Sequence, residues 1–448
     1  MDLLKALENR ELTQVGDDLH RFAADLYPIC RSITGDGVRR TLSEIRKLIP
    51  LQTTEVPTGT RIFDWTVPKE WNIREAYIKD SAGNRVVDFQ QTNLHVISYS
   101  TPVHATMPLN ELKPHLFTLP DHPNWIPYRT SYYEENWGFC LSHDQLLVLE
   151  DGDYEVCIDS TLEDGHLTYG ECYLPGQSTD EVLISCHSCH PSLANDNLSG
   201  ITVATALAQL LAPSDLRYSY RFLFIPGTIG AIAWLARNAD EAKRIRHGLV
   251  LTCLGDRGEF HYKKSRRGDA EIDRAAAHVL HHCSKSSEIL EFSPYGYDER
   301  QYCSPGFNLP VGCLMRSVWG SFPEYHTSAD DLNFIQPGQL AESLRVCTAV
   351  VDVLENNCHY CNQNPYCEPQ LGRRNLYRSI GGAAVPEEIS ARLWVLNLSD
   401  GQHSLLDIAE RSGLPFGTIR DAADLLREGG LLSLTAGFEL LDRNQIRP

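Results

Sequence analysis

The sequence of 448 residues predicts an α/β protein whose main domain is a mostly parallel sheet flanked by helices. Two observations support this fold class. Between about residues 181 and 357, short apolar runs alternate with longer segments of helical apolar spacing, as in strand–helix–strand units. The chain is also longer than one hydrophobic core normally supports, so further domains are expected. We predict two, an inserted β-rich domain and a C-terminal winged-helix domain.

The central strands are expected in the continuous apolar runs, because strands buried on both faces do not alternate with polar residues. These runs are Val182–Cys186, Tyr220–Pro226, Leu249–Leu254 and Pro310–Arg316. Helices are predicted for Leu198–Ala212, Ile229–Arg246, Ala270–Lys285 and Pro337–Asn356. Ligands of such sheets gather at the carboxyl ends of strands, so the residues after each run are the first candidates for chemistry.

The N-terminal segment Leu12–Ile49 has helical spacing and is assigned to the same domain. Short strand-like stretches broken by Pro, Gly and Asn follow it. They are Ala76–Lys79, Val86–Phe89 and His95–Tyr99. We therefore predict an inserted β-rich domain over residues 60–136, within an α/β domain formed by residues 1–59 and 137–375.

After a Gly-, Pro- and Arg-rich loop, residues 387–448 are predicted to form a winged-helix domain. Its helices are expected at Ile389–Leu398, Ser404–Ser412 and Pro415–Glu428, with a hairpin at Leu431–Leu441. This segment holds ten acidic residues against six Arg and no Lys, which argues against DNA binding. A packing role or homo-oligomerisation is the expected use.

Composition excludes several classes of partner. A net charge of −19 disfavours nucleic acid and anionic membranes, which are themselves negative. No segment reaches the roughly 20 apolar residues of a membrane span, and the charged N-terminus lacks the pattern of a secretion signal. Fourteen cysteines in such a chain indicate reduced thiols, so a cytoplasmic location is expected.

The segment EVLISCHSCHPSLANDNLSG carries the strongest chemical signal. His187 ends a buried strand, and Asp196 lies in a polar turn before the next helix. The second signal is PEYHTSADD, in which His326 lies in a turn after the strand Pro310–Arg316. Each residue also has a structural reading as a capping or satisfied polar group. Together, two His and one Asp at the carboxyl edge of one sheet form the protein ligand set of a catalytic zinc.

This arrangement resembles the zinc exopeptidases of the aminopeptidase Y and glutaminyl cyclase type. The shared motifs are His after a strand, A-x-D-x-x-S-G, and Y-H-T. The β insertion, the winged-helix tail and YDERQYCSPGFNLP resemble an uncharacterised bacterial aminopeptidase-like branch of that clan. The resemblance implies that His187 binds the first metal, that Asp196 bridges two metals and that His326 binds the second.

The chain departs from this pattern at three positions. The clan's H-x-D has Cys189 in place of the carboxylate that orients the first histidine. The clan's two glutamates after the next strand, a general base and a metal ligand, are Gly227 and Thr228. The resemblance therefore implies one zinc ion, with a second as the open alternative, and no general base at its usual place.

Another residue near the motifs would then have to act as the general base. The catalytic candidates are Glu324, Asp298 and Glu299, with His190 as a further one. The remaining metal carboxylate of the clan is expected after the strand Leu249–Leu254. Asp256 is the acid found there, and Cys253 is the competing ligand.

Substrate contacts are predicted for Arg266, Arg267, Arg300, His190 and Tyr325. Arg266 and Arg267 belong to the basic run YKKSRRGD with Lys263 and Lys264, which is either a solvated loop or a site for a substrate anion. Cys358, His359, Cys361 and Cys367 form a C-H-x-C cluster. A single CxxC is weak evidence for zinc, so thiols at a helix end are expected.

The expected function is zinc-dependent hydrolysis of an amide bond in a small peptide or amide metabolite. The alternative is a catalytically impaired pseudoenzyme that binds such a molecule, because Gly227 stands where a general-base glutamate is expected.

Overall fold

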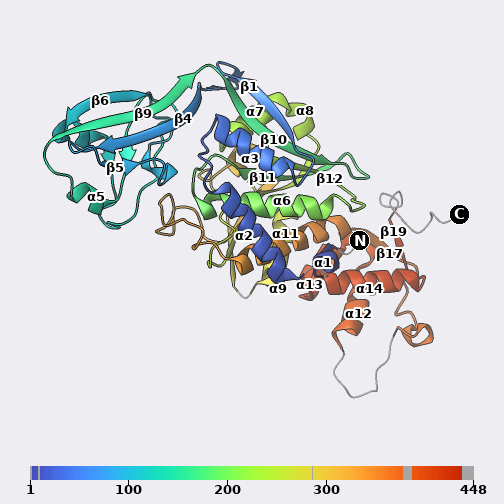
Figure 1. Ribbon diagram of the computed structural model, residues 1–448. Coiled ribbons are helices and arrows are strands. Elements are labelled where there is room, and N and C mark those ends of the chain that lie inside the picture. The colour runs from blue at the N-terminus through green and yellow to red at the C-terminus, as the bar shows by residue number, and fades with distance from the viewer. Residues whose placement is uncertain (1–2, 9–10, 285, 377–385, 436–448) are drawn as a thin grey trace.

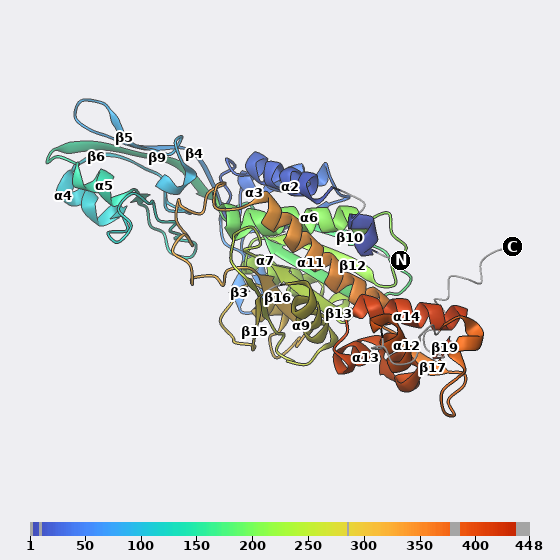
Figure 2. The ribbon, with the colours of Figure 1, turned by 90° about the horizontal axis from the view of Figure 1, so that it is seen from below.

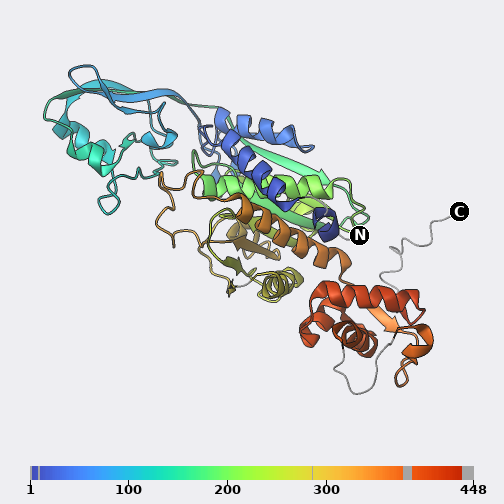
Figure 3. The ribbon, with the colours of Figure 1, turned by 60° about the horizontal axis from the view of Figure 1, so that its bottom comes forward.

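The computed structural model describes residues 3–8, 11–284, 286–376 and 386–435. These residues form three parts in a row (Figure 1, Figure 3). An α/β body lies in the middle, a β-rich module at one end and a helical C-terminal module at the other. The arrangement confirms the predicted fold class.

An eight-stranded sheet forms the middle of the body. In spatial order its strands are β1 (Gln52–Pro57), β10 (His166–Leu174), β12 (Ser219–Ile225), β11 (Glu181–His187), β13 (Ile245–Leu251), β16 (Val311–Met315), β14 (Phe260–Lys263) and β15 (Ser287–Leu290). The four central strands, β12 to β16, are parallel, whereas β10 and β14 pair antiparallel at either side. The carboxyl ends of the central strands therefore meet at one edge.

Helices cover both faces of this sheet (Figure 2). One core lies between the sheet and α2 (Leu12–Leu26), α3 (Asp36–Arg46), α6 (Gly200–Leu211), α9 (Glu271–Cys283) and α11 (Pro337–Asn356). The opposite core contains α7 (Ile229–Arg237) and α10 (Glu299–Tyr302). The helix predicted over Ile229–Arg246 was wrong beyond Arg237, because Asn238 interrupts it before the short helix α8 (Ala239–Ala242) and β13 already begins at Ile245.

The β-rich module is a four-stranded sheet in the order β5-β4-β9-β6. Its strands are β4 (Glu70–Lys79), β5 (Arg85–Asp88), β6 (Val103–Pro108) and β9 (Asp153–Glu163). Residues 153–163 thus join this sheet, beyond residue 136, and their alternating burial suits a strand covered on one face. The strand expected at His95–Tyr99 does not form, because the helical turn η1 (Asn93–His95) is followed by single bridges at Val96 and Ser98.

Small elements complete the module and its junction with the body. They are β2 (Arg61–Ile62), β3 (Trp65–Thr66), α4 (Leu109–Leu112), η2 (Lys113–His115), β7 (Leu116–Phe117), β8 (Phe139–Cys140) and α5 (His143–Leu147).

The C-terminal module has the three predicted helices, α12 (Glu387–Leu398), α13 (Leu405–Ser412) and α14 (Phe416–Glu428). Its sheet joins β17 (His359–Asn362), β18 (Asp400–Ser404) and β19 (Leu432–Leu434) in the order β18-β17-β19. The first strand thus comes from upstream of the predicted boundary. The second half of the predicted hairpin Leu431–Leu441 lies outside the described residues.

The two remaining elements are α1 (Leu3–Glu8) and η4 (Leu371–Arg374). Among the helices that the structure describes, none has the length and apolar character needed to cross a membrane.

Candidate metal centre

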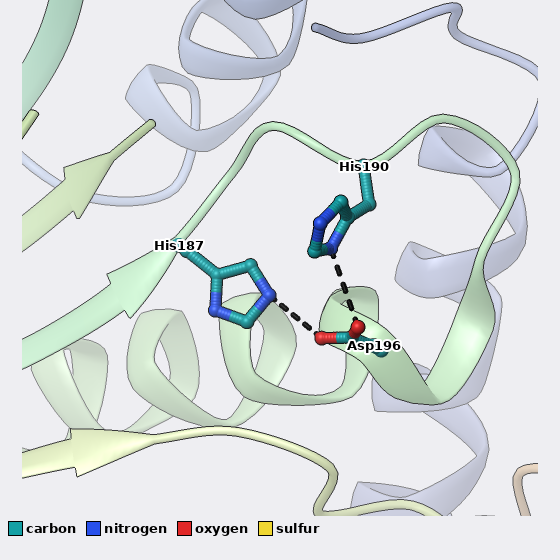
Figure 4. Close-up of side chains that lie close together, drawn as sticks. All are labelled: His187, His190 and Asp196. Carbon is teal, nitrogen blue, oxygen red and sulfur yellow. Dashed lines mark hydrogen bonds and ion pairs between the residues drawn. The ribbon is translucent and has the colours of Figure 1, made fainter. Parts of the chain in front are cut away.

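The candidate site begins at the carboxyl end of β11, where His187 is the last strand residue. The chain then loops into a short helical turn, η3 (Ala194–Ser199), which carries Asp196 (Figure 4). His187 Nε2 lies 2.7 Å from Asp196 Oδ1. Both residues are almost completely buried, so the carboxylate depends on protein partners rather than water.

His326 reaches the same carboxylate from the loop after β16. Its Nε2 lies 3.0 Å from Asp196 Oδ2. The residue adopts a left-handed backbone conformation with φ of +56°, which is uncommon for a residue with a side chain and is typical of strained functional turns. Its side chain is 33% exposed, against 0% for His187, so the site opens to solvent on the His326 side.

A third histidine, His190, joins this cluster. Its Nδ1 lies 3.4 Å from Asp196 Oδ2, an ion-pair distance, but makes no hydrogen bond of good geometry (Figure 4). The ligand atoms of His187, His190 and Asp196 all lie within 4.8 Å of one another. The sequence predicted His190 as a substrate contact or a replacement base, and not as a metal ligand.

The ionisable groups of the cluster affect one another's pKa values. Burial opposes ionisation of Asp196, yet the neighbouring charges of His190 and His187 hold its pKa well below the usual range. Burial lowers the pKa of His187 to about 4 and also lowers that of His326. Burial therefore favours the neutral forms of His187 and His326, and neutral imidazole is the form that binds metal ions.

Backbone donors fix the turn that carries Asp196. Asp330 is buried, and its carboxylate accepts hydrogen bonds from the amides of Asn195 (2.6 Å) and Asp196 (3.0 Å). Burial raises the pKa of Asp330 well above its usual range. Asp330, one of the two adjacent acids in PEYHTSADD, thus fixes the η3 turn. The sequence did not predict this role.

Asp256 does not reach the cluster. Its carboxylate accepts from the Asn195 side chain (2.7 Å), the Gly258 amide (2.6 Å) and the Ser317 hydroxyl (2.7 Å). These bonds engage both oxygens in support of the η3 turn. Asp256 therefore bonds to the residue before Asp196, and no hydrogen bond or ion pair joins it to the candidate ligands among the described residues.

In the pattern of the clan, a carboxylate at position 189 would orient His187, and this chain has Cys189 there. The Cys189 thiol lies 3.8 Å from the Gly227 carbonyl oxygen and 3.7 Å from the Tyr297 hydroxyl. The group beside His187 Nδ1 is the Asn197 amide nitrogen, 3.3 Å away. The Asn197 amide is itself fixed, because its nitrogen also donates to the Leu251 carbonyl at 3.0 Å.

Tyrosine rings enclose the three histidines. Tyr297 stacks on His187 with ring centroids 3.8 Å apart, and Tyr325 stacks on His326 at 3.9 Å. Tyr128 meets both His190 (5.2 Å) and His326 (5.1 Å) edge-on. Of the predicted substrate contacts, His190 and Tyr325 thus lie at the cluster.

Tyr128 comes from the β-rich module, which is hydrogen-bonded to the His326 turn. The Tyr128 amide donates to the His326 carbonyl (2.8 Å), and the Ser328 amide donates to the Ile126 carbonyl (2.8 Å). Pro127 and Thr327 form an antiparallel bridge between these bonds. The module therefore supplies one wall of the site, which no local sequence pattern indicated.

A buried arginine supports the loop behind His190. Arg31 donates from Nε to the His190 carbonyl (2.9 Å) and from Nη1 to the Leu26 carbonyl (2.6 Å). Burial lowers the pKa of Arg31 to about 10. Its bonds to carbonyl groups tie the loop of the cluster to the end of α2.

Gly227 follows β12 at the edge of the site, and its lack of a side chain is required by its surroundings. A Cβ atom there would lie 2.1 Å from Tyr297 Cε1 and 3.1 Å from His187 Cβ. The Tyr297 ring thus fills the space in which a side chain of residue 227 would begin. A glutamate at this position would need Tyr297 to move.

Within the described residues, the three acids predicted as catalytic make no hydrogen bond or ion pair with the cluster. Glu299 is buried in an ion pair with Lys263 (2.8 Å). Asp298 is buried with both oxygens unpartnered, and burial together with the charge of Glu299 raises its pKa well above the usual range. Burial thus favours the protonated form of Asp298. The Glu324 side chain is half-buried, and only its backbone carbonyl is engaged, by Thr327.

The arginines of the basic run YKKSRRGD bond to a residue outside the cluster. Arg266 and Arg267 are exposed and bind the Asn308 side chain and carbonyl, both at 2.9 Å. Arg300 is half-buried on α10, and its Nε has no partner among the described atoms. Among the described residues, none of these three arginines makes a hydrogen bond or ion pair with the cluster.

The donor set fits a zinc ion. Neutral imidazole nitrogens and a carboxylate oxygen are the ligands of catalytic zinc, and ligands bound at ~2.0–2.2 Å lie well within 4.8 Å of each other. The orphaned Nδ1 of His190 is a donor atom without another use. Within the described part of the chain this is the one group of its kind, so Cys358, His359, Cys361 and Cys367 form no such cluster.

The fold and this site define an aminopeptidase-like α/β protein with a C-terminal winged-helix module. Residues 20–357 match the model of a domain of unknown function, DUF4910, and residues 358–434 match a winged helix-turn-helix family. The chain therefore belongs to the DUF4910 family, with a winged helix-turn-helix attached.

A relative from Clostridium acetobutylicum is 53% identical over 94% of this chain and 97% of its own. It is described as a "putative polysaccharide biosynthesis protein with aminopeptidase-like domain". The crystal structure of a "putative peptidase" from the same organism matches with a TM-score of 0.92, at 51% identity over 96% of this chain and 98% of that one. A peptidase M28 precursor from Shewanella amazonensis shares the fold alone, with a TM-score of 0.55 and 14% identity over 79% of this chain and 97% of that one.

Proposed function

We propose that this protein is a zinc-dependent hydrolase of amide bonds, with the metal held by His187, Asp196 and His326 and with His190 as a further candidate ligand. The observation that supports this most directly is the convergence of three imidazole rings on one buried carboxylate at the carboxyl edge of a parallel sheet. One zinc ion is proposed. A second would lack a carboxylate, since Thr228 stands at the position of the clan's second glutamate.

Bound zinc supplies a water of lowered pKa and polarises a carbonyl group. The residues of this chain determine how solvent and substrate reach the cluster. His187 and Asp196 are closed off from solvent, so a substrate has to approach along the exposed edge of His326. The half-buried Tyr325 stacks on His326 at that edge and is the ring available to a small substrate, while the buried Tyr128 packs edge-on against the same histidine.

The proposed substrates are small peptides and amide metabolites, because the β-rich module covers one side of the site. The name of the Clostridium relative joins polysaccharide biosynthesis to an aminopeptidase-like domain. Amides of amino sugars therefore belong in the test panel. All fourteen cysteines are free thiols, in keeping with a proposed cytoplasmic location.

A second candidate function is binding of such a molecule without turnover. Two observations favour it. The Tyr297 ring fills the space beside residue 227. Among the described residues, none of the three acids predicted as catalytic makes a bond to the cluster. A missing general base typically costs about 10²- to 10⁴-fold in rate.

Metal analysis combined with an amide panel separates these functions. We expect about one zinc per chain, lost in His326→Ala and kept in His104→Ala, which alters an exposed histidine of the β-rich module. Hydrolysis that a chelator abolishes and zinc restores supports the hydrolase. Ligand binding without turnover supports the second function, and a chain that binds no zinc contradicts the zinc-dependent hydrolase.

A further inference from the structure

Tyr297 occupies an unusual position between two of the candidate ligands. Its ring stacks on His187, with centroids 3.8 Å apart and planes 30° from parallel. Its hydroxyl lies 3.3 Å from His190 Nε2. The opposite nitrogen of His190, Nδ1, faces Asp196 at 3.4 Å. One side chain thus contacts the rings of both histidines that approach Asp196 from β11 and its loop.

A buried ion pair fixes Tyr297 in this place. The Tyr297 amide donates to both carboxylate oxygens of Glu299, at 2.9 and 3.2 Å. Glu299 pairs with Lys263, whose ammonium also donates to the Tyr295 carbonyl at 2.7 Å. Both charged side chains are at least 97% buried, which makes their loss costly.

Two glycines make room for this arrangement. A Cβ on Gly296 would lie 1.9 Å from Glu299 Oε1 and 2.6 Å from Lys263 Nζ. A Cβ on Gly227 would overlap the Tyr297 ring, as described above. The aromatic ring and the two glycines therefore form one fitted unit around the site.

We propose that Tyr297, locked by the Glu299–Lys263 ion pair into the space beside Gly227, is a positioning residue that orients His187 and His190 for metal binding. This inference rests on the proposed function, since it assumes that the cluster binds a metal ion. Ring partners of metal-binding histidines normally fix the ring orientation, and their loss typically costs 10- to 100-fold in metal affinity. At Cys189, where the clan carries such a carboxylate, this chain has only a thiol.

The test measures affinity for zinc and the visible spectrum of the cobalt-substituted protein. Tyr297→Phe keeps the ring and removes the hydroxyl, so we expect roughly 10-fold weaker zinc binding and a shifted cobalt spectrum. Tyr295→Phe, in the same segment but with a 74% exposed side chain, is the matched control and should match the wild type. Thermal unfolding of the metal-free proteins checks that both variants fold.

A double-mutant cycle separates positioning from simple packing. If the hydroxyl acts through His190, Tyr297→Phe should have little further effect in a His190→Gln background. Gly227→Ala should weaken zinc binding more than Tyr297→Phe does, and adding Tyr297→Ala should relieve the overlap and recover part of that loss.

Two outcomes overturn the proposal in distinguishable ways. Wild-type protein that binds neither zinc nor cobalt removes the proposed function and this inference with it. Wild-type protein that binds zinc, with Tyr297→Phe unchanged in affinity and cobalt spectrum, overturns the role of Tyr297 alone.

Discussion

Asp196 combines burial with charge, and the residues around it explain how both are maintained. Its carboxylate faces three imidazole rings, while its own backbone amide donates to Asp330. A buried carboxylate without such partners would be protonated. The cluster therefore depends on the groups that hold the η3 turn as much as on the candidate ligands.

We predict that Asp330→Ala destabilises the protein by about 2–4 kcal/mol, because it leaves two buried backbone amides without an acceptor. Urea unfolding of the metal-free protein measures this loss. Asp331→Ala is the control, since its carboxylate accepts from the Asn333 and Phe334 amides in a half-buried turn. Equal destabilisation by the two substitutions would contradict the role given to Asp330.

At the scale of elements, continuous apolar runs predicted the four central strands because strands buried on both faces carry no other signal. The run Val182–Cys186 matches β11 and thus placed His187 correctly at the edge of the sheet. Helix ends were harder to predict. The apolar spacing after Ile229 continues into β13, so helix and strand looked like one segment.

Contacts between distant segments were beyond sequence reasoning. Tyr128 reaches the cluster from another module, and Tyr297 does so from the loop before α10. Neither carries a local pattern that differs from an ordinary core tyrosine. The sequence did not place His190 at the cluster, because its ring direction depends on Tyr297 and on the loop that Arg31 holds.

The C-terminal module is docked through charged side chains. Arg420 on α14 donates to Asp352 of α11 at 2.6 Å, so this cation of the third helix is directed into the protein and not toward a partner. Arg274 on α9 pairs with Asp407 (2.5 Å) and Glu410 of α13. These contacts support packing as the use of the winged helix.

We predict that Arg274→Ala loosens this docking, with a cost of about 1 kcal/mol because the pairs are partly exposed and screened by solvent. Hydrogen exchange should become faster in α13 and stay unchanged in β11. Arg21→Ala, which breaks an exposed pair with Asp18, is the control. Unchanged exchange in α13 would show that these ion pairs do not hold the module.

For the whole molecule, buried histidines link stability to pH. Burial lowers the pKa of His247 and of His278 to about 4, from 6.5 in an unfolded chain. The unfolded chain therefore binds more protons between these values, so stability is fully present above pH 6.5 and is lost as pH falls toward 4. For a residue as buried as His247, the loss approaches about 3 kcal/mol.

Urea unfolding of the metal-free protein at pH 7 and pH 5 checks this linkage. We expect lower stability at pH 5, and a smaller difference between the two pH values in His247→Leu. The exposed His104, changed to Gln, is the control and should keep the wild-type difference. A pH dependence that His247→Leu leaves intact would contradict the assignment.

The bridge between Pro127 and Thr327 makes the β-rich module a structural support of the candidate site. Because the module's backbone is bonded to the turn that bears His326, deleting it would not simply uncover the cluster. It would also remove the main-chain support of one candidate ligand. A shortened chain without the module would need a rebuilt His326 turn, so a change to the module would alter the candidate metal site as well as the wall beside it.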